Sequence, residues 1–393
     1  MEEWKTYRIK DICYVNAAQY SIKEKWETVM YLDTGNITEN RIDSIQLFSL
    51  PSDELPSRAR RKVKHNDILY SMVRPNQMHY GILKNPANNL LVSTGFAVIT
   101  VKPDIADPDF VYYFLTQSEL LNHLQSVAEQ SVSAYPSLKS SDIEDIEISL
   151  PSLPEQKRIS SLLSSLDSKI ELNTRINHNL EEQAQTLYKS WFVDFEPFKD
   201  GKFVDSELGM IPEGWQVKNL LEVASVFDSK RKPLSGNERS KMDNIYPYYG
   251  ATSIMDYVDD YIFDGTYLLM GEDGSVMTEE GFPFLQYVTG KFWPNNHAHV
   301  MQGCSGFSTE MLHCALLRKV IKSSVTGAVQ AKISQANMKK ILFVYPPKAI
   351  LTAFDDILQK VYCQKRNISS QNSALSLVRD NMLPRLISGQ LDI

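Results

Sequence analysis

The chain contains 393 residues, of which 43% are hydrophobic and 23% are charged, and its formal net charge is −7 at neutral pH. This length and composition are typical of an ordinary globular protein with two or three domains. The acidic balance counts against a nucleic-acid binder that relies on its overall charge, but phosphates respond to the local field, so local basic clusters matter more.

Two further features concern the cellular compartment. The four cysteines show no CxxC pair and no regular spacing, which fits a reducing environment and argues against a structural zinc site. The first ten residues, MEEWKTYRIK, have no apolar core and do not resemble a signal peptide. No apolar run approaches the ~20 residues that cross a bilayer. We therefore expect a cytoplasmic protein with no membrane partner.

Residues 1–150 are predicted to form a first globular domain. Strand-like runs rich in Ile, Leu, Val and Thr occur at 67–73 and 90–101. Asp107 and Pro108 are typical of a helix start, because aspartate caps the first turn and proline needs no hydrogen-bond acceptor there. The end of the domain alternates apolar and polar residues, as one face of a closing strand does.

A long amphipathic helix is predicted over residues 151–200. Pro154 and Glu155 suit its first turn, since proline is tolerated there and a carboxylate is stabilised at the positive end of the helix dipole. Apolar residues then recur at alternating steps of four and three, the spacing that keeps one stripe of a helix against a partner helix. A helix from Pro154 to Phe192 would be roughly 55 Å long, or about 16 base-pair steps of B-DNA.

A linker rich in turn-forming residues leads to a second globular domain, predicted at residues 208–346. This domain repeats the outline of the first at lower fidelity: the segment 215–223 echoes 4–12, and 311–321 is the expected counterpart of the first domain's helix. A second long helix is predicted over residues 347–393.

The second helix repeats the first one, displaced by 195 positions without a gap. The stripe Ile159, Leu163, Leu166, Ile170, Asn173, Asn177, Leu180, Ala184, Leu187, Trp191 falls on Phe354, Leu358, Val361, Lys365, Ile368, Asn372, Leu375, Arg379, Met382, Leu386. Even a polar interruption recurs, since Asn177 falls on Asn372. A repeat this long predicts two copies of one unit, each a globular domain followed by a spacer helix.

Two such units, related by an approximate two-fold axis, would bring their helices together antiparallel, with the asparagines restricting the register. The predicted fold class is therefore α+β: two globular α/β domains in a pseudo-two-fold arrangement, separated by two long antiparallel coiled-coil helices. Lys365 and Arg379 replace Ile170 and Ala184 of the first stripe, which argues against a fully symmetric coiled coil. The alternative is a pair of unrelated amphipathic helices packed on separate cores.

The sequence carries few signs of catalysis or of metal binding. It contains no GxxxxGK loop, no glycine-rich dinucleotide turn, no GxSxG or HExxH, and no Asn-Pro-Pro-aromatic motif of an amino-methyltransferase. His297 and His299 are two apart, as metal ligands on a strand can be. No nearby cysteine or third histidine completes a site, so no metal is predicted and a structural or DNA-contacting role is favoured.

A nuclease site is the main catalytic alternative. It would use Asp264, Glu272 or Asp273, and Lys291 as two acids and a lysine. The spacing is loose, and the run 271–274 has a simpler interpretation as a tight turn, because aspartate precedes glycine in it.

Basic residues concentrate inside the globular domains, and in the first domain five of them lie within seven residues. The candidate DNA-binding residues of this domain are Arg58, Arg60, Arg61, Lys62, Arg74, Asn76 and Gln77. A guanidinium can bridge guanine O6 and N7, and an amide side chain can pair with adenine N6 and N7. The alternative interpretation of a basic run is a solvated loop.

The second domain combines basic, amide and aromatic groups in a similar way. Its candidate DNA-binding residues are Lys230, Arg231, Lys232, Tyr248, Tyr249, Lys291, Asn295, Asn296 and His297. For any single aromatic residue, a position in the core is the alternative.

Together these segments resemble the specificity subunit of a type I restriction-modification enzyme. The run LPSLPEQKRISSLLSSLDSKIELNTRINHNLEEQAQTLYKSWFVDFEPF is similar to the family's central spacer helix, and LGMIPEGW to its entry into a second target-recognition domain. PSRARRKVKHNDILYSMVRPNQ resembles a first-half recognition domain. PYYGATSIMDYVDDYIFDGTYLLMGEDG and KFWPNNHAHV resemble a second-half domain. The resemblance covers nearly all of the chain.

The resemblance implies a subunit without catalytic residues or cofactors of its own. Each globular domain would read one half of a split, asymmetric site in double-stranded DNA, and the helices would set the gap and dock two methyltransferase subunits. Those subunits would bind S-adenosylmethionine. Two restriction/translocase subunits, using ATP and Mg, would complete a system of phage defence. A self-contained endonuclease built on Asp264, Glu272 and Lys291 is the alternative, and a helical scaffold for proteins alone is a third hypothesis.

Overall fold

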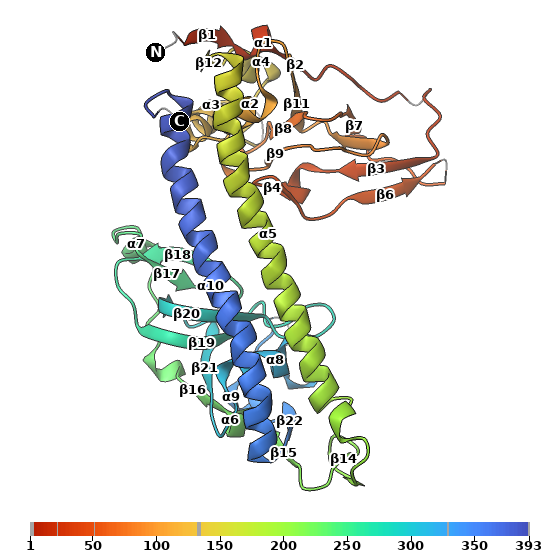
Figure 1. Cartoon of the computed structure of the whole chain (residues 1–393), viewed down its shortest axis with the longest axis vertical. Helices are drawn as coiled ribbons and strands as arrows, with labels where there is room; N and C mark the ends of the chain where they lie inside the picture. The colour runs from red at the N-terminus through yellow and green to blue at the C-terminus, as the bar shows by residue number, and fades with distance from the viewer. Residues whose placement is uncertain (1–3, 22, 51, 132–134, 328–329, 392–393) are drawn as a thin grey trace. The chain divides into compact units, whose positions relative to one another are not determined.

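The computed structural model describes residues 4–21, 23–50, 52–131, 135–327 and 330–391. The chain forms two compact units: the first comprises Met1–Glu171 with Ser373–Ile393, and the second comprises Leu172–Asn372 (Figure 1). Each unit combines a globular domain with a stretch of both long helices. Residues 1–3 and 392–393, at the edges of the first predicted domain and of the second predicted helix, lie outside the described residues.

The long helices are α5 (Leu153–Phe192) and α10 (Lys348–Ile387), each of 40 residues. Every residue of the predicted stripe is buried or partly buried. In the second unit Asn173 of α5 contacts Asn372 of α10, whereas Glu181, further along α5, contacts Lys365, which comes earlier in α10. This order shows that the two helices run antiparallel there.

The first unit has the same antiparallel order. Asp167 of α5 pairs with Arg379 of α10, and Ile159, earlier in α5, shares an apolar cluster with Leu386, later in α10. The predicted fold class, α+β with two long antiparallel helices, is confirmed.

Polar residues on the helix stripe find partners across the pair. Asn173 Nδ2 donates to Asn372 Oδ1 at 2.9 Å, and Asn177 Nδ2 donates to Ser369 Oγ at 3.1 Å. Lys365 and Arg379, the two departures from the apolar stripe, each face a carboxylate of α5 at 2.8 Å. Hydrogen bonds of this kind restrict the register of a helix pair more than they stabilise it.

The globular domain of the first unit precedes α5 in the sequence and consists largely of β-strands. Its elements are β1 (Lys5–Arg8), α1 (Ile9–Ile12), β2 (Cys13–Val15), β3 (Thr28–Leu32), η1 (Thr34–Asn36), β4 (Ile37–Thr38), β5 (Arg41–Ile42), β6 (Gln46–Ser49), β7 (Ala59–Lys62), β8 (Ile68–Ser71), η2 (Pro75–Gln77), β9 (Tyr80–Ile82), β10 (Leu90–Ser93), β11 (Phe96–Val101), α2 (Pro108–Leu115), α3 (Ser118–Glu129), α4 (Ser140–Glu144) and β12 (Glu147–Leu150). Two four-stranded sheets, β6-β3-β10-β7 and β2-β11-β8-β9, form its body. Side chains of both sheets, among them Leu32, Val92 and Phe96, meet in one apolar cluster.

The globular domain of the second unit lies between α5 and α10 in the sequence. Its elements are η3 (Glu196–Phe198), β13 (Phe203–Val204), β14 (Ile211–Pro212), β15 (Gln216–Asn219), α6 (Leu220–Val223), β16 (Ala224–Val226), η4 (Asp228–Lys230), α7 (Gly236–Arg239), β17 (Tyr246–Tyr249), β18 (Ile254–Val258), β19 (Phe263–Gly271), β20 (Leu285–Pro294), β21 (Ala298–Gly303), α8 (Thr309–Leu317), η5 (Lys322–Ser324), α9 (Gln335–Met338) and β22 (Leu342–Tyr345). Its main sheet has six strands in the order β16-β21-β19-β20-β17-β18.

The two domains share one frame. The first strand pairs antiparallel with the last, with Lys5 opposite Leu150 and Gln216 opposite Tyr345. In the first domain α1 follows, and then β2, which pairs with β11; β11 pairs in turn with β8. In the second domain α6 follows, and then β16, which pairs with β21; β21 pairs in turn with β19. A capped helix comes next: Phe110 N–H donates to the Asp107 side chain at 3.0 Å, as the sequence predicted for the start of α2. The echo between the two domains is therefore a shared topology.

One place where the domains differ lies between the second and third strands of this frame in chain order. Between β2 and β8, residues 16–67 add β3 to β7, whereas between β16 and β19, residues 227–262 add η4, α7, β17 and β18. We refer to these segments as the first insert and the second insert. Most of the candidate DNA-binding residues lie in them. No helix among the described residues has the length and apolar character needed to span a membrane.

Candidate nucleic-acid interface

The basic run of the first insert has few internal partners. Arg58 is exposed, and Arg60 and Arg61 are half-buried. None of these three arginines forms an ion pair with a described residue, whereas Lys62 pairs with Glu24 and lies 5.3 Å from the ring centre of Trp26. Guanidinium groups that form no ion pair with a described residue remain available to phosphates.

The backbone explains how these arginines are directed. Val92 of β10 pairs with Arg61 and Ser93 pairs with Ala59, so Arg60 occupies a bulge in β7. A bulge re-aims one side chain without ending the strand. The Nε of Arg61 is buried and has no hydrogen-bond partner, and burial lowers the pKa of this guanidinium. A buried cation without a counter-ion is costly, so binding of an anion here would be favourable.

A second candidate segment of this domain is the turn around η2. Arg74 and Met78 flank η2 with φ of 47° and 54°, a left-handed conformation that non-glycine residues rarely adopt. The Arg74 guanidinium lies 4.8 Å from the ring centre of Tyr135, and Asn76 and Gln77 are exposed. Exposed amides beside a strained turn and a stacked arginine are typical of a recognition loop. Tyr135 was not predicted, because only the fold brings it to Arg74.

In the second domain, the structure gives Arg231 an internal role. Its side chain is only 12% exposed, and Nη1 donates to Glu272 at 2.7 Å and to the carbonyl of Ala298 at 2.6 Å. Asp228 lies close to the same guanidinium, with Oδ2 3.7 Å from Nη2. The guanidinium nitrogens of Arg231 thus donate to internal acceptors, whereas Arg58 and Arg60 form no ion pair with a described residue.

Three further candidates of the second domain are also turned inward. Tyr248 is 1% exposed and its hydroxyl accepts the Leu234 N–H at 3.0 Å. Asn295 is 3% exposed and its Oδ1 accepts the His297 N–H at 2.7 Å. Tyr249 packs against the cluster that contains Phe292. These side chains shape the domain, and direct contact with DNA would require them to move.

The other candidates of the second domain are accessible. Lys230, Lys232 and Asn296 are exposed, and His297 is bound to Asp273 through Nδ1 at 2.5 Å. Lys291 is exposed and lies 4.5 Å from the ring centre of Tyr261 and 5.8 Å from that of Tyr246. The accessible basic candidates of this domain are therefore lysines, of which Lys230 and Lys291 lie beside aromatic rings.

His299 belongs to an ion network in the core. Asp228, Glu272 and His299 are the one group of three potential metal ligands among the described residues, with ligand atoms within 4.8 Å of one another. Arg231 and Lys332 both contact Glu272, at 2.7 and 3.4 Å, so the carboxylates already have cationic partners. Burial alone would raise the pKa of Asp228, but hydrogen bonds and the charge of His299 hold it below its usual range. The network ties η4 to β21.

The residues of the nuclease alternative do not assemble. Asp264 lies opposite Lys291 near the start of β19, whereas Glu272 follows the last residue of that strand. Eight residues of extended strand separate the two acids by roughly 26 Å. A single metal-binding or acid–base site cannot span that distance.

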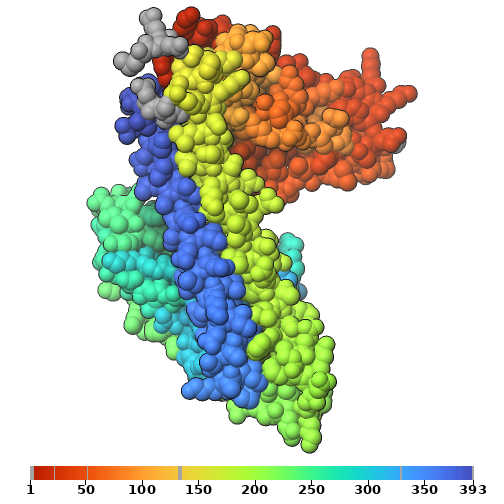
Figure 2. Space-filling model, in the orientation of Figure 1, coloured from red at the N-terminus to blue at the C-terminus, as the bar shows by residue number. Residues whose placement is uncertain are grey.

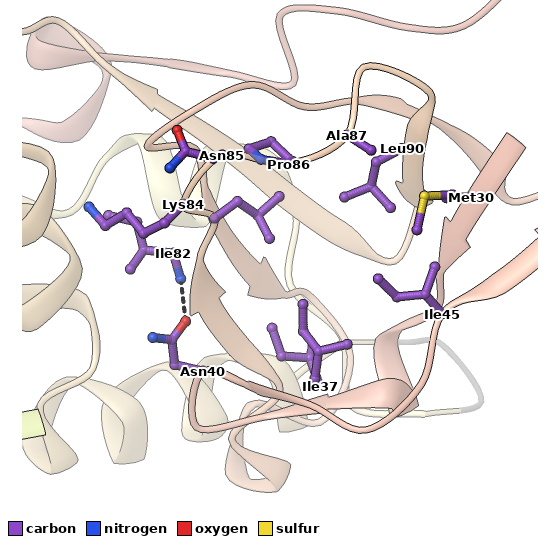
Figure 3. Close-up of a pocket in the computed structure, with 12 residues that line it drawn as sticks. Met30, Ile37, Asn40, Ile45, Ile82, Lys84, Asn85, Pro86, Ala87 and Leu90 are labelled. Carbon is purple, nitrogen blue, oxygen red and sulfur yellow. Dashed lines mark hydrogen bonds between the residues drawn. The ribbon is translucent and has the colours of Figure 1, made fainter. Parts of the chain in front are cut away.

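A cavity of about 370 Å³ opens beside the two sheets of the first domain (Figure 3). Its lining is mainly apolar and includes Met30, Ile37, Ile45 and Leu90, with Asn40 accepting the Ile82 N–H at 2.9 Å. The cationic lining residue Lys84 pairs with Asp109 at 2.8 Å. The cavity thus offers no free nucleophile or acid–base pair for catalysis.

Comparison with known proteins places this geometry in a family. The chain matches the type I restriction modification DNA specificity domain twice, over residues 1–182 and 212–372. The chain belongs to this type I specificity family. Each match covers one of the two globular domains together with part of the long helix that follows it. The predicted family resemblance is confirmed, and the chain is a specificity subunit of the type I restriction-modification class.

Similar full-length proteins support the same assignment. The HindI specificity subunit of Haemophilus influenzae is 23% identical over 472 residues, covering 100% of both chains. The MjaIX specificity subunit of Methanocaldococcus jannaschii is 26% identical over 427 residues, covering 100% of this chain and 94% of that one. The crystal structure of a type I S subunit from M. genitalium has the same fold, with a TM-score of 0.55, 16% identity, and coverage of 98% of this chain and 96% of that one.

Proposed function

We propose that this specificity subunit reads a two-part DNA site, with one half recognised by each globular domain, and that it has no catalytic activity of its own. The observation that carries this proposal is the shared frame with two different inserts. A common frame explains why both domains attach to the helices in one way. Different inserts explain how each domain would prefer a different half-site.

The charge distribution supports a DNA face on the first domain, formed by the first insert and the turn around η2. The chain is acidic overall, with a formal net charge of −7, yet Arg58, Arg60 and Arg61 have no described carboxylate partner. Phosphates are attracted by such a local concentration of positive charge. Arg60, Arg74 and Gln77 then supply groups able to bond base edges.

The spacer helices are proposed to dock two methyltransferase subunits. In the second unit Leu172 and Ile176 of α5 are 49% and 38% exposed, and in the first unit Leu377 of α10 is 65% exposed. Figure 2 shows long strips of both helices uncovered on one face. Exposed leucine and isoleucine one turn apart are typical of a helix that packs against another protein.

The remaining partners follow from the same proposal. The methyltransferase subunits would bring S-adenosylmethionine, and two restriction/translocase subunits would bring ATP and Mg. The described residues of this chain supply the DNA-reading and docking surfaces, and we place this assembly in the cytoplasm. The endonuclease alternative has no assembled site to support it, because Asp264 and Glu272 lie at opposite ends of β19.

The experiment is to produce the chain with its methyltransferase subunits and to map methylated adenines by sequencing the treated DNA. The expected result is one site with two defined halves and an undefined gap of constant length. The purified chain alone, incubated with Mg²⁺ and DNA, should leave the DNA uncut. Cleavage by the chain alone would favour the endonuclease, and a single uninterrupted site would contradict two-part reading.

A further inference from the structure

In the first unit, one carboxylate joins the globular domain to both spacer helices. Tyr113 of α2 donates its hydroxyl to Asp167 Oδ2 of α5 at 2.6 Å. Arg379 of α10 donates Nη1 to Asp167 Oδ1 at 2.8 Å. These three residues, which we refer to as the Asp167 triad, connect three separate helices through the two oxygens of one side chain.

The second unit contains a similar triad of a tyrosine, a carboxylate and an arginine, but its carboxylate comes from the globular domain. Glu310 of α8 accepts the Tyr287 hydroxyl of β20 at 2.7 Å and Nη1 of Arg366 of α10 at 2.9 Å. Arg366 Nη1 also lies 2.7 Å from the Tyr287 hydroxyl oxygen. Gln359 of α10 donates to the other Glu310 oxygen at 3.0 Å. In this Glu310 triad, as in the Asp167 triad, the tyrosine comes from the globular domain and the arginine from α10.

Each triad has a buried member beside side chains that are about a third exposed, among them Asp167 at 34% and Arg366 at 31%. Tyr113 is 5% exposed and Glu310 is 6% exposed. Burial raises the pKa of Tyr113, and Asp167 raises it further, so the phenol remains a donor. Burial alone would raise the pKa of Glu310, but the hydrogen bonds from Gln359 and Tyr287 and the charge of Arg366 hold it below its usual range. The Glu310 triad therefore keeps an ionised carboxylate bonded to fixed donors.

The apolar contacts between each domain and the helices lack the directionality of hydrogen bonds such as those of the triads, of Gln156 and of Gln185. Ile159 and Leu163 of α5 pack with Phe110 of α2 in one apolar cluster, and Phe354 and Leu358 of α10 belong to the corresponding cluster of the second unit. Apolar burial is non-directional, so a small rotation of a domain on its helices costs little in these contacts. The same rotation would separate each triad carboxylate from its donors, which is more costly, above all for the buried Glu310.

We propose that the Asp167 and Glu310 triads are positioning devices, which hold each recognition domain in one orientation on the spacer helices and thereby limit the gap between half-sites to one length. This inference rests on the proposed two-part reading. The hydrogen bonds of the triads join the domains to the helices and involve no described residue of the inserts, so we expect them to act on gap length and not on base preference.

The test uses the chain in complex with its methyltransferase subunits and a DNA library in which the gap is changed by one base pair in either direction. Tyr113→Phe and Tyr287→Phe remove one hydroxyl each, and Arg366→Met removes the shared cation. A hydrogen bond to an ionised group contributes roughly a tenfold preference or more. We therefore expect the variants to methylate wrong-gap sites about tenfold more than the unaltered chain does, relative to the native gap. Arg366→Lys, which retains the cation, should restore the discrimination.

Matched controls separate positioning from general destabilisation. Tyr112→Phe alters the neighbouring tyrosine of α2, which is 8% exposed but contacts the rings of Tyr80 and Tyr113 instead of the helix carboxylate. Arg318→Met breaks an ion pair with Glu182 whose arginine is 61% exposed. Both controls should keep the native gap preference. The exposed Arg318–Glu182 pair is weak, and the Tyr112 contacts described above are made by its ring, so neither change should alter the orientation of a domain on the helices.

The outcomes distinguish this inference from the function on which it rests. Wider gap tolerance with unchanged half-site bases supports the triads as positioning devices. An unchanged gap preference in all three triad variants overturns the inference, and so does a change of bases within a half-site. If the unaltered complex itself shows no two-part site, the proposed function fails instead.

Discussion

The two inserts carry similar basic runs, but the arginines of these runs differ in their ion-pair partners. In the first insert Arg60 and Arg61 have no ion-pair partner among the described residues, whereas in the second insert Arg231 is held by Glu272 and Asp228. The difference arises from residues far away in sequence, since Glu272 follows β19 and reaches Arg231 only in the folded domain. A basic run therefore indicates an available DNA contact only where the fold brings no carboxylate to it.

Exchanging the globular domains is the strongest way to separate the two regions. Replacing residues 1–150 with the first domain of another family member should change one half of the recognised site completely and leave the other half and the gap unchanged. The physical reason is that each domain has its own frame, core and insert. Sequencing of methylated DNA checks this outcome, with the reciprocal exchange of residues 208–346 as the control. Changes in both halves would show that the domains do not read independently.

Helix length should control the gap between the halves. Inserting one heptad after Asn173 lengthens α5 by roughly 10 Å, which corresponds to about three base-pair steps. We expect the same half-sites with a wider gap when a heptad is also added to the facing part of α10, so that the stripe stays in register. The methylated sites are again sequenced. Altered half-site bases with the original gap would contradict the role of the helices as a spacer.

The two arginines give a sharper comparison inside the inserts. Arg231→Ala should lower the free energy of unfolding by about 2–3 kcal/mol, because Glu272 would lose its charge-assisted hydrogen bond in a mostly buried site and keep only the longer contact with Lys332. Thermal or urea unfolding measures this loss. Arg231→Met with Glu272→Gln is the matched control, since removing both charges should recover part of the stability. A stable Arg231→Ala variant that simply binds DNA more weakly would show that the arginine contacts DNA after all.

A pH titration tests the interior of the second unit alone. Burial lowers the pKa of His313 to about 4. Between that pH and about 6.5, His313 is neutral in the folded chain but protonated in the unfolded chain. Stability is therefore fully present above about pH 6.5 and is lost as pH falls toward 4, by roughly 3 kcal/mol. His313→Phe should flatten this slope in unfolding measurements between pH 7 and pH 4. An unchanged slope would mean that other groups cause the acid sensitivity.

The smallest effect is expected for single base contacts of the first insert. Arg60→Ala should weaken binding by about 1–3 kcal/mol and relax preference at one base position. A pure phosphate contact would instead weaken all sequences alike and reduce the salt slope by about one unit. Lys62→Ala serves as the control, since Lys62 is already paired with Glu24. If affinity, preference and salt slope are all unchanged in Arg60→Ala, the run is only a solvated loop.

The helices were the most predictable part of the molecule. Heptad spacing follows directly from helix geometry, so the stripe from Ile159 to Trp191 and its copy could be recognised without any tertiary information, and all of its residues are at least partly buried. The cap at Asp107 was predictable for the same reason, because it depends on residues three apart. Local periodicity and local hydrogen bonds carry this information.

The candidate site was less predictable, because it depends on contacts between distant residues. Tyr248 and Asn295 have the chemistry of base recognition, yet the fold buries them. Tyr113 and Asp167 are 54 positions apart and gave no joint signal, although a 2.6 Å hydrogen bond links them. Lys365 and Arg379 were correctly noted as departures from the apolar stripe, but their carboxylate partners could not be assigned from spacing alone.

The most direct test of two-part reading is methylation mapping of a hybrid chain in complex with its methyltransferase subunits. The hybrid carries the first insert of another family member in place of residues 16–67, within the native frame. The account predicts a site in which only one half is new, with the other half and the gap length unchanged. An unaltered site, or a change that reaches both halves, would contradict it.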